Sequence, residues 1–285
     1  MVWVMLDGVG IGPTGPQNPL TEFATGPLAT LGVSRPADAA TTMLTAHPID
    51  ATLGVLGLPQ SGTGQASLVS GVNAARQLGH HSGPWPGPSL YPLLDAALPA
   101  RVYKAGGRVG LANAYPPAYH AALLARKVRL NSIARAALAG GAIQSEQGLH
   151  PALGRWTPGV GLDDDLDAAA EAARALLTDA SVLTIFDAWV SDRLGHQMHP
   201  EPALQYARRL NEFFGVLLEN ISPDALLVIT SDHGNFEDLS VKTHTTNPTP
   251  MAAVGPGAHY FAGITDLTGV APAISAALGL ADHPE

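Results

Sequence analysis

Two residues that commonly bind metals, Asp232 and His233, follow an apolar run in the segment TSDHGNFED. Aspartate and histidine are unfavourable at the edge of an apolar core unless they are paired or bound to something. A polar turn is the plain explanation, whereas a metal site would require further ligands elsewhere in the chain. The sequence offers several such candidates.

Three other segments carry residues of the same types. Asp7 ends the first apolar run, VWVML, and His244 lies in the loop segment KTHTTNPTP. Asp192 and His196 are four residues apart in SDRLGH, a spacing that places both on one face of a helical turn. Each has an ordinary explanation when taken alone: a turn, a loop histidine, or a surface helix pair. Together they predict one metal site.

Two hydroxyl residues, Ser61 and Thr63, lie between glycines in GLPQSGTGQ, where a helix is expected to begin near Gly62. A hydroxyl at a helix N-terminus is well placed to hold a phosphate oxygen, because free backbone N–H groups point toward the same position. The alternative is that Ser61 only caps the helix.

Composition limits the chemistry that is available. The chain of 285 residues has no cysteine, so disulfides and thiolate ligands are excluded and a metal must use carboxylates, imidazoles, hydroxyls or water. Its formal charge of -9 argues against binding to nucleic acid or to anionic membranes. We find no signal-peptide pattern and no apolar stretch of membrane-spanning length, and we therefore expect a cytoplasmic protein. The sequence leaves the oligomeric state open.

Alternating apolar strands and helices predict an α/β fold, namely a three-layer, doubly wound arrangement around a largely parallel sheet. We expect one domain over 1–285, with a small cap or lid within about 80–160. The expected strands cover 2–6, 108–114, 181–187, 224–230 and 250–255. The expected helices cover 61–78, 163–177, 200–220 and 265–280.

This fold would bring the candidate residues together, because function in open α/β sheets gathers beyond the carboxyl ends of the strands. Two segments that resemble other ligand-binding motifs are rejected as sites. The G-x-G-x-x-G match at 10–15 has Pro13 and Pro16 where a dinucleotide-binding helix should be under way. The acidic run at 163–167 lacks the glycine and the closing glutamate of a calcium loop.

Four segments, SGTGQ, DRLGH, DHGN and HTTNPTP, resemble signatures of the alkaline phosphatase superfamily. The likeness is greatest to the branch of cofactor-independent phosphoglycerate mutase and phosphopentomutase. It covers the first few residues, 57–75 and roughly 181–280. One departure is Gln65, where both mutases have histidine.

The resemblance implies two divalent ions, manganese or zinc. One would be held by Asp192, His196 and His244. The other would be held by Asp7, Ser61, Asp232 and His233.

The resemblance also implies phosphoryl transfer through a phosphoserine on Ser61, with Thr63 as the alternative nucleophile. We expect hydrolysis of a small phosphate monoester or diester. A phosphomutase with an abbreviated cap is the alternative, and a non-catalytic metal-binding module is a third possibility. Arg76, Asn235 and His81 are candidate substrate contacts. Basic residues between 101 and 155 could supply the carboxylate clamp that a phosphoglycerate mutase needs.

Overall fold

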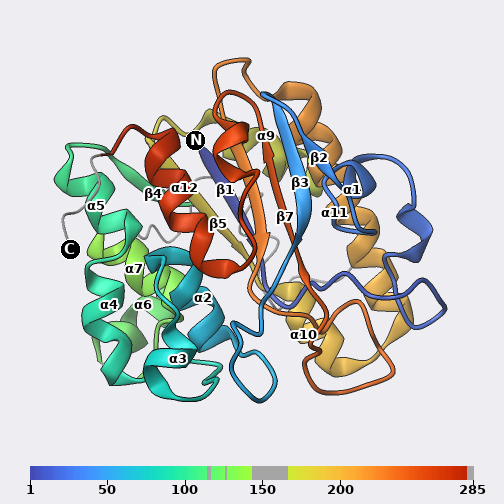
Figure 1. Ribbon diagram of the computed structural model, residues 1–285, viewed down its shortest axis with the longest axis horizontal. Coiled ribbons are helices and arrows are strands. Elements are labelled where there is room, and N and C mark those ends of the chain that lie inside the picture. The colour runs from blue at the N-terminus through green and yellow to red at the C-terminus, as the bar shows by residue number, and fades with distance from the viewer. Residues whose placement is uncertain (114–116, 126, 143–165, 281–285) are drawn as a thin grey trace.

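A seven-stranded sheet forms the centre of the protein in the computed structural model, which describes residues 1–113, 117–125, 127–142 and 166–280. The strand order is β2-β3-β7-β6-β1-β5-β4 (Figure 1). In chain order the strands are β1 (Val2–Leu6), β2 (Ala39–Ala40), β3 (Leu44–Ile49), β4 (Val109–Leu111), β5 (Leu183–Ala188), β6 (Leu227–Ser231) and β7 (Thr249–Val254).

Most of the strands run in one direction. β1 pairs in parallel with both β5 and β6, and β4 pairs in parallel with β5. β7 is antiparallel to β6, and β3 is antiparallel to β7, so β3 points the same way as the four central strands. The expected α/β fold around a largely parallel sheet is confirmed.

Helices cover both faces of this sheet (Figure 1). One face is covered by α2 (Ser61–Ser70), α3 (Ala74–Leu78), α4 (Tyr91–Asp95), α5 (Leu98–Lys104), α7 (Ser132–Ala139) and α12 (Val270–Ala277). The other face is covered by α1 (Pro27–Thr30), α9 (Leu166–Thr178), α10 (Val190–Gln197) and α11 (Pro200–Asn220). α6 (Pro117–Leu124) precedes α7, and short 3-10 turns occupy Thr21–Phe23, Pro88–Leu90, Ala258–Phe261 and Leu267–Gly269.

The first strand shows why two helical layers are needed. Successive side chains of a strand point to opposite faces of the sheet. Trp3 and Met5 accordingly lie in one apolar cluster, and Val4 and Leu6 lie in the other. Burial of each such side chain contributes about 1.5–3 kcal/mol, which fixes β1 in the middle of the sheet. The buried Trp3 Nε1 donates to Thr230 Oγ1 at 2.9 Å, which also joins β1 to β6.

Sequence periodicity located the central strands and the edge strand β4, but it missed the opposite edge, β2 and β3. The helix expected at 200–220 is observed as α11 over the same residues. β2 and β3 were not predicted, because His47 and Pro48 interrupt any strand pattern in LTAHPI. β3 pairs on its outer side only with the two-residue β2, and prolines are tolerated near such sheet edges.

The region expected to form a cap contributes largely to the main core. Leu90, Leu94, Leu98 and Ile133 are buried in the same apolar cluster as Trp3. Residues 143–160 of the expected cap lie outside the described residues, and a cap there stays a prediction.

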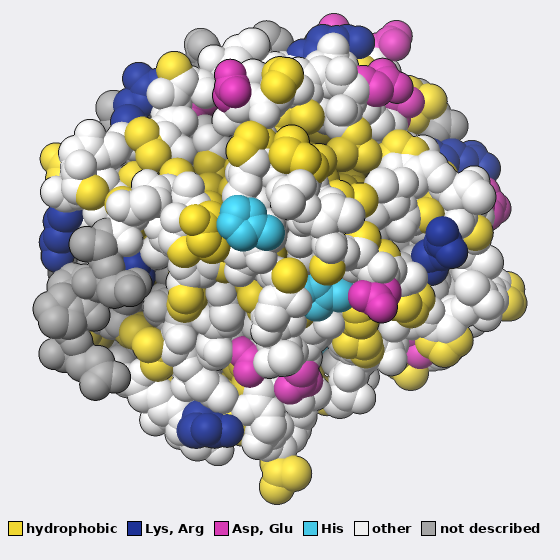
Figure 2. Space-filling view, turned by 45° about the horizontal axis from the view of Figure 1, so that its top comes forward, with side chains coloured by type: hydrophobic (Ala, Val, Ile, Leu, Met, Phe, Trp, Pro, Cys, Tyr) yellow, Lys and Arg dark blue, Asp and Glu magenta, His cyan; other side chains and the backbone are white. Residues whose placement is uncertain are grey.

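Charged side chains do not gather into one basic area on the face seen in Figure 2, where Lys and Arg lie apart from one another. Among the residues that the structure describes, no helix is both long and apolar enough to span a membrane.

Candidate metal centre

The site lies where three neighbouring central strands end. β1 leads into Asp7, β6 leads into Asp232 and His233, and β5 leads into α10, which carries Asp192. Because β5, β1 and β6 are adjacent and parallel, their carboxyl ends meet at one edge of the sheet. Residues more than 200 positions apart in the sequence are therefore brought into contact.

An inner cluster consists of Asp7, Ser61, Asp232 and His233, all of which are buried. His233 Nε2 is the centre of this cluster. It lies 2.9 Å from Ser61 Oγ, 3.5 Å from Asp7 Oδ1 and 3.6 Å from Asp232 Oδ2.

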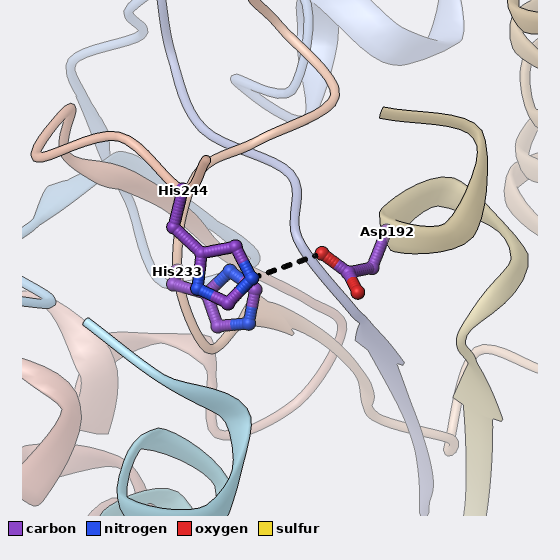
Figure 3. Close-up of side chains that lie close together, drawn as sticks. All are labelled: Asp192, His233 and His244. Atoms are coloured by element: carbon purple, nitrogen blue, oxygen red, sulfur yellow. Dashed lines mark ion pairs between the residues drawn. The ribbon is translucent and has the colours of Figure 1, made fainter. Parts of the chain in front are cut away.

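An outer cluster consists of Asp192, His196 and His244. Asp192 Oδ1 lies 3.5 Å from His244 Nε2, and Asp192 Oδ2 lies 3.4 Å from His196 Nε2. Figure 3 shows the His244 side chain directed toward Asp192, with the His233 ring beside it. The His233 and His244 rings stack with centroids 3.8 Å apart, so the two clusters adjoin.

The carboxylate oxygens of the inner cluster are arranged as a cation would require. Asp7 Oδ2 accepts from Gln65 Nε2 at 3.1 Å, and Asp232 Oδ1 accepts from the Gly8 N–H at 3.1 Å. The second oxygen of each carboxylate is buried and has no hydrogen-bond partner among the described residues. Both of these free oxygens face His233 Nε2. Buried polar atoms left without partners are costly, and a bound cation would satisfy them.

The side chains of His196 and His244 are also oriented so that each could bind a cation. The Nδ1 atoms of His244 and His196 lie 2.7 and 2.8 Å from the carbonyl oxygens of Pro59 and Lys242. A carbonyl can only accept, so each Nδ1 carries a proton, and Nε2 either binds a metal ion or, without one, carries a second proton facing Asp192. These two Nε2 atoms lie 3.2 Å apart, and a proton or a metal ion must separate them.

Charges in the inner cluster are poorly compensated without a cation. Burial, followed by the neighbouring carboxylates of Asp232 and Asp192, raises the pKa of Asp7 well above its ordinary value. Burial raises the pKa of Asp232 to about 7. Burial and the adjacent His244 lower the pKa of His233 to about 3, so its ring is neutral. A divalent ion would reverse the cost of ionising these carboxylates.

The outer cluster is balanced by its own histidines. Burial alone would raise the pKa of Asp192, but hydrogen bonding to His196 and His244 outweighs burial and lowers that pKa far below its ordinary value. Asp192 in turn raises the pKa of His196. Asn235 Nδ2 also donates to Asp192 Oδ1 at 2.7 Å, which places this predicted substrate contact against a candidate ligand.

Ser61 is the first residue of α2, after Gln60 in an extended conformation. Glycines allow this helix end to approach the cluster. A Cβ on Gly64 would lie 2.7 Å from the Asp232 carbonyl oxygen, and a Cβ on Gly62 would lie 2.5 Å from the Ser82 carbonyl oxygen. Thr63 Oγ1 lies near the carbonyl oxygens of Gln60 and Ser82, at 3.2 and 3.4 Å, rather than at His233.

Two other predicted substrate contacts, Arg76 and His81, lie near the loop that precedes Ser61. His81 Nε2 donates to the carbonyl oxygens of Thr52 and Val55 at 3.1 and 3.3 Å. Arg76 on α3 lies against Gly54, where a Cβ would be 3.7 Å from its Nη2. The structure therefore places Arg76 and His81 around the loop that precedes Ser61, and it places Asn235 at Asp192.

Three of the basic residues proposed as a carboxylate clamp have partners outside the two clusters. Arg101 Nη2 donates to Ser275 Oγ at 2.6 Å, Arg108 pairs with Asp179 at 3.5 Å, and Arg135 pairs with Asp95 at 2.7 Å. The side chains of Arg126 and Arg155 lie outside the described residues.

A further buried carboxylate, Asp187, was missed from the sequence. It lies near the end of β5, beside Met5 of β1, and burial raises its pKa to about 7. Asn131 Nδ2 donates to its Oδ2 at 2.5 Å, whereas Oδ1 has no partner among the described residues. The signal was available, because LTIFD ends an apolar strand in aspartate just as VWVMLD does.

Glu237 was also missed, although it belongs to the segment TSDHGNFED. Its Oε2 accepts from the backbone N–H groups of Gly10 and Asn235 at 2.9 and 2.8 Å. A Cβ on Gly10 would lie 2.4 Å from Glu237 Oε1. Gly10 therefore makes room for a buried carboxylate, which accounts for one glycine of the rejected dinucleotide pattern.

Known proteins resemble this chain in two ways, some in sequence and others in fold. A family model for the metalloenzyme superfamily matches residues 156–282. The 2,3-bisphosphoglycerate-independent phosphoglycerate mutase of Legionella pneumophila is 29% identical over 103 residues, which are 33% of this chain and 20% of that protein. The Staphylococcus aureus mutase is 33% identical over 73 residues, 23% of this chain and 14% of that protein. The matches thus span a fifth or less of these relatives.

Solved structures extend the similarity across the whole chain. Alkaline phosphatase from the Antarctic bacterium TAB5 aligns with TM-score 0.54 and 12% identity, over 99% of this chain and 98% of that chain. The PH0037 protein of Pyrococcus horikoshii aligns with TM-score 0.59 and 12% identity, over 100% and 98%. At such identities the similarity establishes the fold alone. The carboxyl-terminal part of the chain, residues 156–282, is thus similar in sequence to the metalloenzyme superfamily, and the whole chain shares the fold of alkaline phosphatase.

Proposed function

We propose that this protein hydrolyses a phosphate monoester, or a diester, through a phosphoserine formed on Ser61. The observation that carries the proposal is the position of Ser61 Oγ, which lies 2.9 Å from His233 Nε2 at the start of α2. A serine so placed is surrounded by unpaired carboxylate oxygens and by imidazole lone pairs.

We assign one divalent ion to the inner cluster and one to the outer cluster, with manganese or zinc as the metal because the donors are oxygen and nitrogen. When bound, two such ions stabilise the attacking and the leaving oxygens of an in-line displacement. His233 could be a ligand of either ion. Its ring nitrogen lies close enough to share an ion with Asp7 and Asp232, or with Asp192 and His244.

Residues of the chain would carry out the attack on phosphorus and hold the phosphoryl group. Ser61 Oγ gives up its proton to solvent and attacks phosphorus. The Oγ–P bond forms, and the bond from phosphorus to the ester oxygen breaks as that oxygen takes a proton from solvent. The Thr63 and Gly64 N–H groups already donate to the carbonyl oxygens of Gln60 and Ser82. The N–H groups of Ser61 and Gly62 would therefore be the ones to bind the phosphoryl oxygens. A water oxygen then replaces Oγ on phosphorus and regenerates the serine.

A phosphomutase is the alternative, supported by the mutase relatives. It would need cations to hold a second charged group of the substrate during transfer. The engagement of Arg101, Arg108 and Arg135 with partners outside the two clusters favours hydrolysis instead.

The test uses p-nitrophenyl phosphate and bis-p-nitrophenyl phosphate with chelated protein, before and after addition of Mn²⁺ or Zn²⁺. We expect metal-restored turnover that falls on the order of 10³-fold or more in Ser61→Ala, as for loss of other enzymic nucleophiles. Thr63→Ala is the matched control and should retain the serine reaction. Loss in Thr63→Ala with retention in Ser61→Ala would reassign the nucleophile. Stoichiometric metal binding without turnover would overturn the hydrolase proposal.

A further inference from the structure

An open groove of about 520 Å³ lies next to the candidate nucleophile. One wall is formed by Leu56, Leu58 and Gln60, and the other by His80, His81 and the segment that ends at Gly83. A Cβ on Gly83 would lie 3.0 Å from Gln60 Cβ and 3.3 Å from the Ser61 nitrogen. The groove therefore begins at the residue that precedes Ser61.

Hydrogen bonds hold both walls next to the candidate metal centre. The first wall is anchored because His244 Nδ1 donates to the Pro59 carbonyl at 2.7 Å, one residue beyond Leu58. The second wall is anchored because the Thr63 N–H donates to the Ser82 carbonyl at 3.0 Å. The groove thus borders the inner cluster through α2 and the outer cluster through His244.

The groove presents apolar surface to solvent. Leu56 is 97% exposed and Leu58 is 37% exposed, and Trp85, two residues beyond Gly83, is 43% exposed. Single exposed apolar residues are common, but several gathered at one site mark a binding surface.

The residues that line the groove include no lysine or arginine. His81 lies in its wall, and burial lowers the pKa of this histidine, so its ring is neutral near pH 7. A carboxylate or a second phosphate would find no fixed positive charge there. An uncharged apolar group would instead replace water on Leu56 and Leu58 and gain the free energy of burial.

In-line displacement gives the groove a role. An in-line attack by Ser61 Oγ would direct the leaving oxygen away from Ser61, and we take the residues of the outer cluster as its surroundings. His244 belongs to that cluster and is hydrogen-bonded to Pro59, beside Leu58. The organic part of the ester is therefore directed along the leucine wall.

We propose that this groove is the leaving-group subsite and that it selects phosphate monoesters of uncharged, apolar alcohols over those of hydroxy acids or polyols. This inference rests on the proposed function. The phosphoryl group moves from the ester oxygen to Ser61 and then to water, and the alcohol departs along the groove with the proton it has gained.

The first experiment compares kcat/KM for n-hexyl phosphate, glycerol 1-phosphate and 3-phosphoglycerate. The first two esters release primary alcohols, so a difference between them reflects mainly recognition. We expect the metal-loaded protein to prefer n-hexyl phosphate about tenfold or more, within the range that apolar pockets achieve. Leu58→Asn, close in size but polar, should reduce this preference roughly fivefold.

Val182→Asn is the control, because Val182 is 42% exposed but lies next to Arg108 at the amino end of β5, away from the groove. It should leave the preference unchanged. Three results would overturn the subsite while leaving the hydrolase proposal intact. They are an equal kcat/KM for n-hexyl phosphate and glycerol 1-phosphate, a preference for 3-phosphoglycerate, and an unchanged preference in Leu58→Asn.

A binding experiment separates the two proposals. Calorimetry would compare n-hexylphosphonate with methylphosphonate on the metal-loaded protein, and again on Leu58→Asn. Tighter binding of n-hexylphosphonate by about tenfold, lost in Leu58→Asn, supports the subsite even if no ester is turned over. In that case the hydrolase proposal fails and the apolar site stands. Equal binding of both phosphonates would contradict the subsite independently of catalysis.

Discussion

The inner and outer clusters both contain aspartate and histidine, but the negative charge of their carboxylates is compensated in different ways. Asp232 in the inner cluster is fully buried, and its pKa is raised by that burial to about 7. Asp192 in the outer cluster keeps 20% of its side chain exposed, and its contacts with His196 and His244 lower its pKa. The inner cluster therefore depends on an added cation for charge balance, whereas the outer cluster is partly balanced by its own imidazoles.

Removing one inner carboxylate should have the largest effect on activity. We expect Asp232→Asn to reduce metal-dependent phosphatase turnover on the order of 10³-fold, because it removes a candidate ligand beside Ser61. The same substitution should raise the thermal midpoint of the metal-free protein near neutral pH. The substituted amide can keep the acceptor for the Gly8 N–H and donate toward His233 Nε2, and it carries no buried charge. A lowered midpoint would contradict the charge imbalance of the inner cluster.

The matched outer substitution should change the stability of the metal-free protein in the opposite direction. Asp192→Asn removes a carboxylate whose lowered pKa means that its ionised form stabilises the fold above its unfolded-state pKa. We expect a loss of about 1–2 kcal/mol near neutral pH, limited by its partial exposure to solvent. Chemical denaturation of the two variants in chelator measures the comparison directly. If both variants shift in the same direction, the two clusters are not electrostatically different.

The pH dependence of the metal-free protein should follow the inner carboxylates. Their raised pKa values mean that the stabilising effect of protonation is fully present below the ordinary carboxyl pKa and is lost as pH rises to about 7. We expect the thermal midpoint to fall over that interval, and added Mn²⁺ to restore more of it at pH about 8 than at pH about 5. Differential scanning fluorimetry across pH provides the test. A metal-induced shift independent of pH would show that the metal does not displace these protons.

Asp187 should give the smallest effect of the four. Its charge is buried near Asp7 and Asp232, but Asn131 already donates to one of its oxygens. Asp187→Asn should raise the stability of the metal-free protein near pH 8 by less than Asp232→Asn does, and it should lower turnover about tenfold, as for residues that support metal ligands. An effect on metal-free stability as large as that of Asp232→Asn would mean that Asp187 belongs to the inner cluster.

The sequence predicted a helix or strand best where the residues of that element alone form a clear apolar pattern. Periodicity located α11, and the apolar runs located β1, β5 and β6, because these elements are central and each has a strong pattern of its own. It failed for β3, whose pairing depends on β7, about 200 residues later in the chain. It did not show that several side chains within the region 80–160, where a small cap was expected, complete the core over β1.

The sequence by itself determined the chemistry that is possible: no thiolates, several aspartates and histidines after apolar strands, and a serine at a helix start. Only the tertiary structure decided how those groups share the site. It placed His233 between Ser61 and two unpaired carboxylate oxygens, stacked that ring on His244, and added Asp187. The physical reason is that ligand type is a property of each residue, whereas burial and partner distances arise only when β5, β1 and β6 end side by side.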